Sequence, residues 1–287
     1  MADAEPSPPS GLPAPLTIGG YAGWTWQLFR ASYARFILVY MGGVAFVRTV
    51  HFLLVVAVAE LTSGRSGDVA TLATSLASGI TLAAVAGSVL AALAGFSFAA
   101  HVCDRTVRPG EAWRHVRSLL SQVVVAALYV SMPLVLLLFV VGPSVEILLT
   151  VMILPALLGP PVLVHSIAWE GKGFRDAATR AKNLLAGSWG RVLSALILLS
   201  LGAALVQILV LTMIGGLVGG GSPDEPVEYA LALVLEVATT GTVWLFTSAA
   251  ATVAYLDLRA RFEGLDPAGL ASEADALTPV GTAPNQG

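Results

Sequence analysis

Three ionisable residues stand inside long apolar stretches of the chain. Arg48 and His51 are three positions apart, so they share one face of a helix, and Glu236 lies far away in the last apolar stretch. If these stretches span a membrane, such groups indicate either an ion or proton path or a neutralising pair of opposite charges. A pair between Arg48 and Glu236 explains both residues fully, and the path is the alternative.

Glu236 also begins a polar stripe. Its members recur at multiples of four positions and are Glu236, Thr240, Ser248 and Thr252. On a membrane helix this face must meet protein or water. Hydrogen bonds to neighbouring helices are the simpler interpretation, and a water-filled path is the other.

No catalytic, metal or cofactor site is expected from the remaining residues. His101 and His165 have no carboxylate or cysteine at metal-ligand spacing. There is no phosphate-binding loop, dinucleotide motif or nucleophile elbow. Pro155, Pro160 and Pro161 interrupt one apolar stretch, where bending of a helix is a commoner role than a binding site.

Composition explains where these residues must lie. The chain is 56% hydrophobic and 11% charged, whereas soluble domains carry about 25% charged residues. Nearly uncharged stretches cover residues 36–59, 70–100, 118–141, 147–168, 192–217 and 229–256. Each exceeds the roughly 20 residues that cross a bilayer as a helix. The sequence therefore predicts an all-α, polytopic membrane bundle of six transmembrane helices.

The basic residues set the expected orientation. With six spans, nearly all of the 15 Lys and Arg residues lie on the side of the N-terminus, and Arg65 lies on the other side. Cytoplasmic loops carry such an excess of basic residues. We therefore expect both termini in the cytoplasm and the chain in a bacterial cytoplasmic membrane. The basic residues are spread over three connections beside the spans, so nucleic-acid binding is not expected, whereas anionic lipid headgroups are expected partners.

Small residues recur at every fourth position of the second apolar stretch. They are Gly79, Ala83, Gly87, Ala91 and Gly95. Small side chains allow close approach of membrane helices, so the pattern predicts tight packing in the bundle, with an oligomer interface as the alternative. A leucine at Gly87 would then push a neighbouring helix away.

A short signature occurs twice, as RASYAR at 30–35 and AGSWGR at 186–191. Each follows a segment whose apolar residues recur at helical spacing, and each precedes a span. The pattern predicts interfacial amphipathic helices on the cytoplasmic side, with Arg35, Trp189 and Arg191 facing lipid. A shorter, similar segment, RPGEAWRHVRSLL, leads into the third span.

These segments suggest three parallel repeats at about 17–100, 108–168 and 171–258. The membrane domain is then expected over 17–262. Pro and Ala dominate 1–16, and 263–287 is rich in small residues with acids, so both are expected to be disordered tails.

The chain resembles a bacterial membrane-protein family. The stretches PLTIGGYAGWTWQLFRASYARFILVY, RPGEAWRHVRSLL, EGKGFRDAATRAKNLLAGSWGRVL and YLDLRARFEGLD are similar to the glycerophosphoryl diester phosphodiesterase membrane-domain family, over most of residues 15–266. The resemblance implies a six-span membrane domain. It does not imply phosphodiesterase activity, because the His-Arg pair typical of the catalytic barrel is absent.

Two functions remain open at this point. One is a non-enzymatic scaffold or lipid-interacting accessory protein. The other is a small-solute transporter or channel with a path near Arg48, Glu236 and the polar stripe. A water-filled path along the stripe favours transport, whereas a closed core of small residues favours the scaffold.

Overall fold

The structure is a computed structural model that describes residues 16–62, 68–103, 105–141, 162–217, 226–265 and 267–277. The named helices are α1 (Ile18–Thr62), α2 (Asp68–Val102), α3 (Pro109–Val141), α5 (Phe174–Leu185), α6 (Trp189–Leu217), α7 (Pro226–Glu263) and α8 (Pro267–Leu277). Residues 162–170 are also helical. Within these ranges there is no strand, so the predicted all-α fold is confirmed.

Five of the described helices are long and apolar enough to cross a membrane, namely α1, α2, α3, α6 and α7. The fourth predicted span, 147–168, lies largely outside the described residues, as do Pro155, Pro160 and Pro161. Its last part, 162–168, is helical and buried. The described residues therefore support a membrane protein with several spans, and the count of six stays a prediction.

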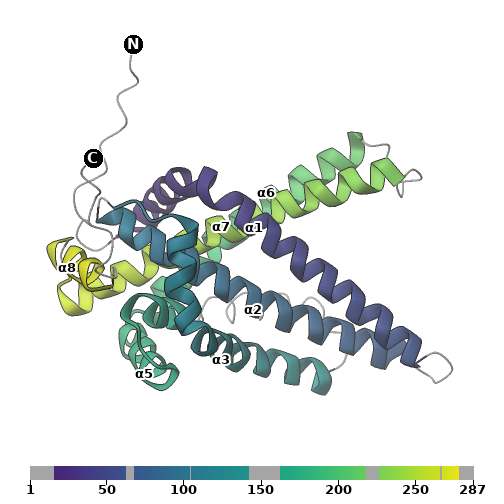
Figure 1. Cartoon of the computed structure of the whole chain (residues 1–287), viewed down its shortest axis with the longest axis horizontal. Helices are drawn as coiled ribbons and strands as arrows, with labels where there is room; N and C mark the ends of the chain where they lie inside the picture. Colours follow the sequence, from purple (N-terminus) through teal and green to yellow (C-terminus); the bar gives the residue numbers. More distant parts are fainter. Residues whose placement is uncertain are drawn as a thin grey trace, which may run out of the picture.

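Helix α7 is central to the arrangement, because it packs against α1, α2 and α6. Helix α2 lies between α1 and α3. In Figure 1, α6 and α7 run together in one direction while α1, α2 and α3 extend in another, and α5 and α8 lie at the end where the two groups meet. The largest buried side chains belong to one hydrophobic core, and among them are Tyr21, Tyr40, Phe98, Ile167 and Tyr255.

Away from this core the helices present apolar side chains outward. Exposed examples are Leu38, Phe46, Phe52, Leu205, Ile208, Leu209, Met213 and Val234. In water such a surface would be costly, whereas lipid is as apolar as leucine. The exposed faces therefore fit helices that are surrounded by hydrocarbon.

The predicted interfacial helices differ among themselves. Helix α5 is a separate 12-residue amphipathic helix that buries Ala177, Ala181 and Leu184, as the sequence pattern predicts. The segment before Arg35 is instead part of α1, which is continuous over 45 residues and bends in its first part (Figure 1). At about 1.5 Å per residue α1 is roughly 68 Å long, more than a bilayer core requires.

The two signatures consequently play different structural roles. AGSWGR forms the turn between α5 and α6, where Gly187 has a φ of 80° and the amide of Ser188 donates to the carbonyl of Leu185. RASYAR lies within α1, with Ser32 buried. The match does not produce a break in α1, because Ala31 stands at the position that corresponds to Gly187, and alanine disfavours the positive φ that the turn requires.

The C-terminal segment corrects the expectation of a disordered tail over 263–287. A turn at Gly264, with a φ of 62°, leads into α8, and Leu270 of α8 is fully buried. Composition alone did not predict this helix, which is held by two individual contacts: Leu270 is buried against the bundle, and Glu273 pairs with Arg259 of α7. Residues 1–15 and 278–287 lie outside the described part of the chain, so the expectation of disorder there stays a prediction.

Candidate functional site

The polar stripe on α7 is bonded to the surrounding elements along its whole length. Every one of its four members contacts a polar side chain from another segment; the pairs are Glu236 with Arg48, Thr240 with Gln207, Ser248 with Tyr40, and Thr252 with His165. The partners come from α1, from α6 and from residues 162–170. The arrangement is the one that interhelical hydrogen bonding predicts.

Tyr40 joins three helices at the middle of this stripe. Its fully buried hydroxyl lies 2.8 Å from Oγ of Ser248 on α7 and 2.9 Å from the carbonyl oxygen of Leu90 on α2. Ser248 in turn donates to the carbonyl of Trp244 in its own helix. The hydroxyl groups of Tyr40 and Ser248 are therefore both hydrogen-bonded within the protein.

His165 occupies a notch made by glycine. The imidazole is 2% exposed, and its Nε2 lies 2.8 Å from Oγ1 of Thr252. A Cβ built on Gly95 would lie 2.4 Å from the same nitrogen. The absence of a side chain at Gly95 is thus what allows the histidine to reach α7.

The other small residues of α2 are less closely packed. A Cβ on Gly79 would lie 3.0 Å from the ring of His51, and Ala91 packs against the core, whereas Ala83 is only half-buried. At Gly87 no atom of a neighbouring helix in the described part of the chain lies within 4 Å of such a Cβ. A methyl group would therefore fit at Gly87, the tightest contact of the stripe lies at Gly95, and the separation of helices by a leucine at Gly87 stays a prediction.

Arg48 and Glu236 form the predicted ion pair, between α1 and α7. Their side chains are 52% and 36% exposed, so the pair lies on the surface of the described bundle. The expectation of a pair inside the bundle is corrected in this respect. His51 does not join the pair, since its Nδ1 lies 3.4 Å from Oγ of Ser78 on α2. Arg48 and His51 share a face but serve two different neighbours.

We expect Arg48→Met and Glu236→Gln each to lower the free energy of unfolding in detergent by about 2 kcal/mol, because each strands the opposite charge among apolar side chains. The double variant should recover part of the loss. Unfolding curves of the wild type, both single variants and the double variant measure the coupling energy. Strictly additive losses would show that the two side chains do not interact.

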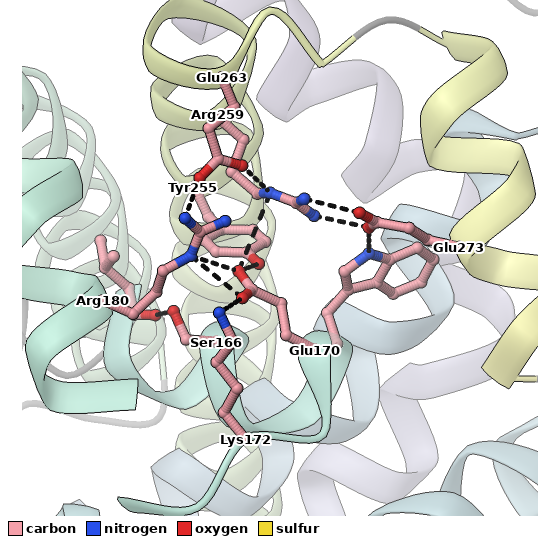
Figure 2. Close-up of polar contacts among 10 residues, drawn as sticks. Ser166, Glu170, Lys172, Arg180, Tyr255, Arg259, Glu263 and Glu273 are labelled. Carbon is pink, nitrogen blue, oxygen red and sulfur yellow. Dashed lines mark hydrogen bonds and ion pairs between the residues drawn. The ribbon is translucent and has the colours of Figure 1, made fainter. Parts of the chain in front are cut away.

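A second group of polar residues lies where α5, α7 and α8 meet, and we term it the Glu170 cluster. Its members are Glu170, Lys172, Arg180, Tyr255, Arg259, Glu263 and Glu273 (Figure 2). The carboxylate of Glu170 is 8% exposed and accepts hydrogen bonds from the hydroxyl of Tyr255 at 2.5 Å and from Nε of Arg180 at 3.1 Å. The ammonium of Lys172 lies 2.6 Å away.

Arg259 holds the other half of the cluster. Its side chain is 5% exposed; Nη1 and Nη2 each donate to Glu273 at 2.7 Å, and Nε donates to Glu263 at 2.9 Å. The indole nitrogen of Trp169 donates to the same Glu273 carboxylate at 2.9 Å. Arg180 pairs with Glu263 and so links the two halves.

Charges within the cluster balance, because three basic side chains face three carboxylates. Burial by itself raises the pKa of Glu170, but the hydrogen bonds from Lys172 and Tyr255 and the nearby guanidinium groups outweigh it and hold the pKa below its usual value. The hydrogen bonds from Arg259 lower the pKa of Glu273. Both carboxylates are therefore ionised at neutral pH.

Asp257 forms a third polar centre, one helical turn from Arg261 on α7. Its side chain is 1% exposed and accepts hydrogen bonds from Nε of Arg261 at 2.8 and 2.9 Å and from the hydroxyl of Tyr21 at 2.5 Å. The amide of Leu16 also donates to it, at 3.1 Å. Since Arg261 donates in turn to the carbonyl of Leu16, this centre fastens the start of the described chain to α7.

The residues predicted to face lipid behave differently from one another. Arg35 is exposed on α1. Arg191 instead turns toward Asp257, with Nη2 3.6 Å from Oδ2, and its Nε and Nη2 atoms are buried. The Arg191 side chain is still 38% exposed, so the structure adds an acidic neighbour that is distant in the sequence, and the lipid-facing position of this residue stays a prediction. Trp189 begins α6, but its side chain lies outside the described residues.

Sequence reasoning missed Glu170, Asp257 and Glu273, because it treated the basic residues as an uninterrupted rim. A local signal was present in α7. Asp257 and Arg261 are four positions apart, as are Arg259 and Glu263, which is the spacing of ion pairs on one helix face. Glu273, the partner of Arg259 from α8, had no such spacing to indicate it.

Among the described residues, no group of three or more His, Cys, Asp or Glu side chains is placed to hold a metal ion. In comparisons with known proteins the chain matches no family model, no curated protein and no solved structure. The assignment of a function therefore depends on the geometry of α7 and its neighbours.

Proposed function

We propose that the chain is a non-enzymatic integral membrane protein of the bacterial cytoplasmic membrane that acts as a scaffold or lipid-interacting accessory protein. The polar stripe of α7 carries this proposal. A transport path needs polar groups that are free to meet a solute or water, whereas all four stripe residues bond to side chains of neighbouring segments.

The end of the bundle supports the same proposal. Its ionic groups are engaged with one another in the Glu170 cluster and around Asp257, and exposed Arg35 remains for lipid headgroups. We further propose six spans with both termini in the cytoplasm, and a relationship to the glycerophosphoryl diester phosphodiesterase membrane-domain family. The repeated small residues of α2 then serve helix packing and carry no chemistry of their own.

Accessibility of the stripe to water tests the proposal. In a background with Cys103 replaced by serine, we expect Thr240→Cys and Ser248→Cys to resist a membrane-impermeant maleimide, because both positions face neighbouring helices. Ser272→Cys, on the exposed face of α8, is the matched control and should react once the membranes are opened. Rapid labelling of the two stripe positions, comparable to that of Ser272→Cys, would favour the transporter and refute the scaffold.

A further inference from the structure

Glu273 occupies the position that an anionic ligand would take. Both terminal nitrogens of Arg259 donate to its carboxylate at 2.7 Å, and the indole nitrogen of Trp169 adds a third donor at 2.9 Å (Figure 2). An arginine fork that donates two parallel hydrogen bonds recognises carboxylates and phosphates alike. Three converging donors also match the several acceptor oxygens of a phosphate group.

These donors do not belong to α8 and do not depend on it for their position. Arg259 is held on α7 by the hydrogen bond to Glu263, and its guanidinium lies 5.8 Å from the centre of the Tyr255 ring. Trp169 packs against Phe96 of α2, with ring centres 5.7 Å apart. The fork and the indole would therefore keep their arrangement without α8.

The charge balance favours an anion at this place. With Glu273 docked, three carboxylates neutralise Lys172, Arg180 and Arg259. Without Glu273, two carboxylates would face these three basic side chains, and Arg259, whose side chain is 5% exposed with α8 docked, would lose its bidentate partner. The unpaired charge and the free donors of the Arg259 fork would then attract a replacement anion.

Helix α8 has the features of a segment that can undock from α7. It has 11 residues, fewer than an isolated helix needs for stability in water, and a glycine turn at Gly264 connects it to α7. Leu270 and Glu273 anchor it, and the side chain of Glu273 is itself 39% exposed. A ligand that competed with the Glu273 carboxylate for Arg259 and Trp169 would remove a principal contact of α8.

We propose that the fork of Arg259 and the indole nitrogen of Trp169 form a binding site for a phosphate group, and that Glu273 of α8 occupies this site as a tethered competitor. The phosphate group belongs either to an anionic lipid headgroup or to a soluble phosphate compound. Binding of either displaces α8. The site is separate from the polar stripe, so it stands or falls independently of the proposed scaffold function.

Hydrogen exchange of the α8 amides tests this site in the full chain. The protein is placed in nanodiscs of phosphatidylcholine and compared with and without inorganic phosphate, at ionic strength matched by chloride. A parallel sample contains phosphatidic acid in place of part of the phosphatidylcholine. We expect several-fold faster exchange over 267–277 with phosphate in at least one of the two forms. A response to phosphatidic acid alone identifies a lipid, and a response to inorganic phosphate alone identifies a soluble ligand.

Two variants make the result specific. Glu273→Gln removes the competing charge, so it should bind inorganic phosphate or phosphatidic acid several-fold more tightly than the wild type, and Trp169→Phe in the same background should reverse much of the gain. Asp176→Asn, which neutralises an exposed carboxylate on α5, is the control and should leave binding unchanged. Unchanged α8 exchange with both forms of phosphate, or equal gains from Glu273→Gln and Asp176→Asn, would overturn the proposal.

Discussion

Gly95→Ala is expected to destabilise the protein by about 3 kcal/mol, although it adds a single methyl group. The new Cβ would lie 2.4 Å from Nε2 and 2.7 Å from Cδ2 of His165. The imidazole ring is rigid and 2% exposed, so it cannot relieve the overlap by a small rotation of a flexible end. Either α2 moves away from residues 162–170, or His165 gives up its hydrogen bond to Thr252.

Gly87→Ala is the matched control, in the same helix. No neighbouring helix of the described chain lies within 4 Å of the added methyl group there, and alanine is the better helix former by up to about 1 kcal/mol. The midpoint of unfolding in detergent should therefore fall for Gly95→Ala and stay or rise for Gly87→Ala. Equal losses at the two positions would mean that the notch around His165 does not govern packing.

This pair of glycines shows what the sequence can and cannot predict. The four-residue repeat of small side chains correctly marks one face of α2, because a helix brings positions four apart to the same side. It cannot distinguish Gly87 from Gly95, since the difference lies in what comes from the other helix. Only the placement of His165, 70 positions further along the chain, makes one glycine indispensable.

The same limit applies to the charged residues. Arg48 and Glu236 were predictable as partners because each is an isolated charge in an apolar stretch, and few other groups can neutralise it. Arg191 and Arg259 lie near many charges of both signs, so their partners depend on which helix ends converge. Glu273 was assigned to a disordered tail because composition averages over a segment, whereas docking of α8 relies on two individual residues.

The extent of the first span was predictable only in part, for a different reason. Hydrophobic length identifies α1, α2, α3, α6 and α7 directly. It does not separate an interfacial segment from a span when the two form one continuous helix, as at the start of α1. A change in polarity along a helix need not interrupt its backbone hydrogen bonds.

Asp257→Asn is the second change for which we expect a large loss, about 3 to 5 kcal/mol. The carboxylate is 1% exposed and lies against two guanidinium groups, those of Arg261 and Arg191. The amide keeps the shape and can still accept from the amide of Leu16, so the loss reports the missing charge and not a cavity. The start of the described chain should also become easier to cleave, because Arg261 no longer has a carboxylate to orient it toward the carbonyl of Leu16.

A double-mutant cycle separates the pairing from the burial of Asp257. Arg261→Gln alone also leaves a charge without its partner, and in combination with Asp257→Asn it should restore part of the stability. Only part is expected, since Arg191 still faces the neutral amide. We expect a clear coupling energy, because the side chains of Arg261 and Asp257 are only 17% and 1% exposed, so water screens their charges little. A coupling energy near zero for Asp257 and Arg261, measured from the same unfolding curves, would show that Asp257 stabilises the bundle through Arg191 and the hydrogen bonds from Tyr21 and Leu16, without help from Arg261.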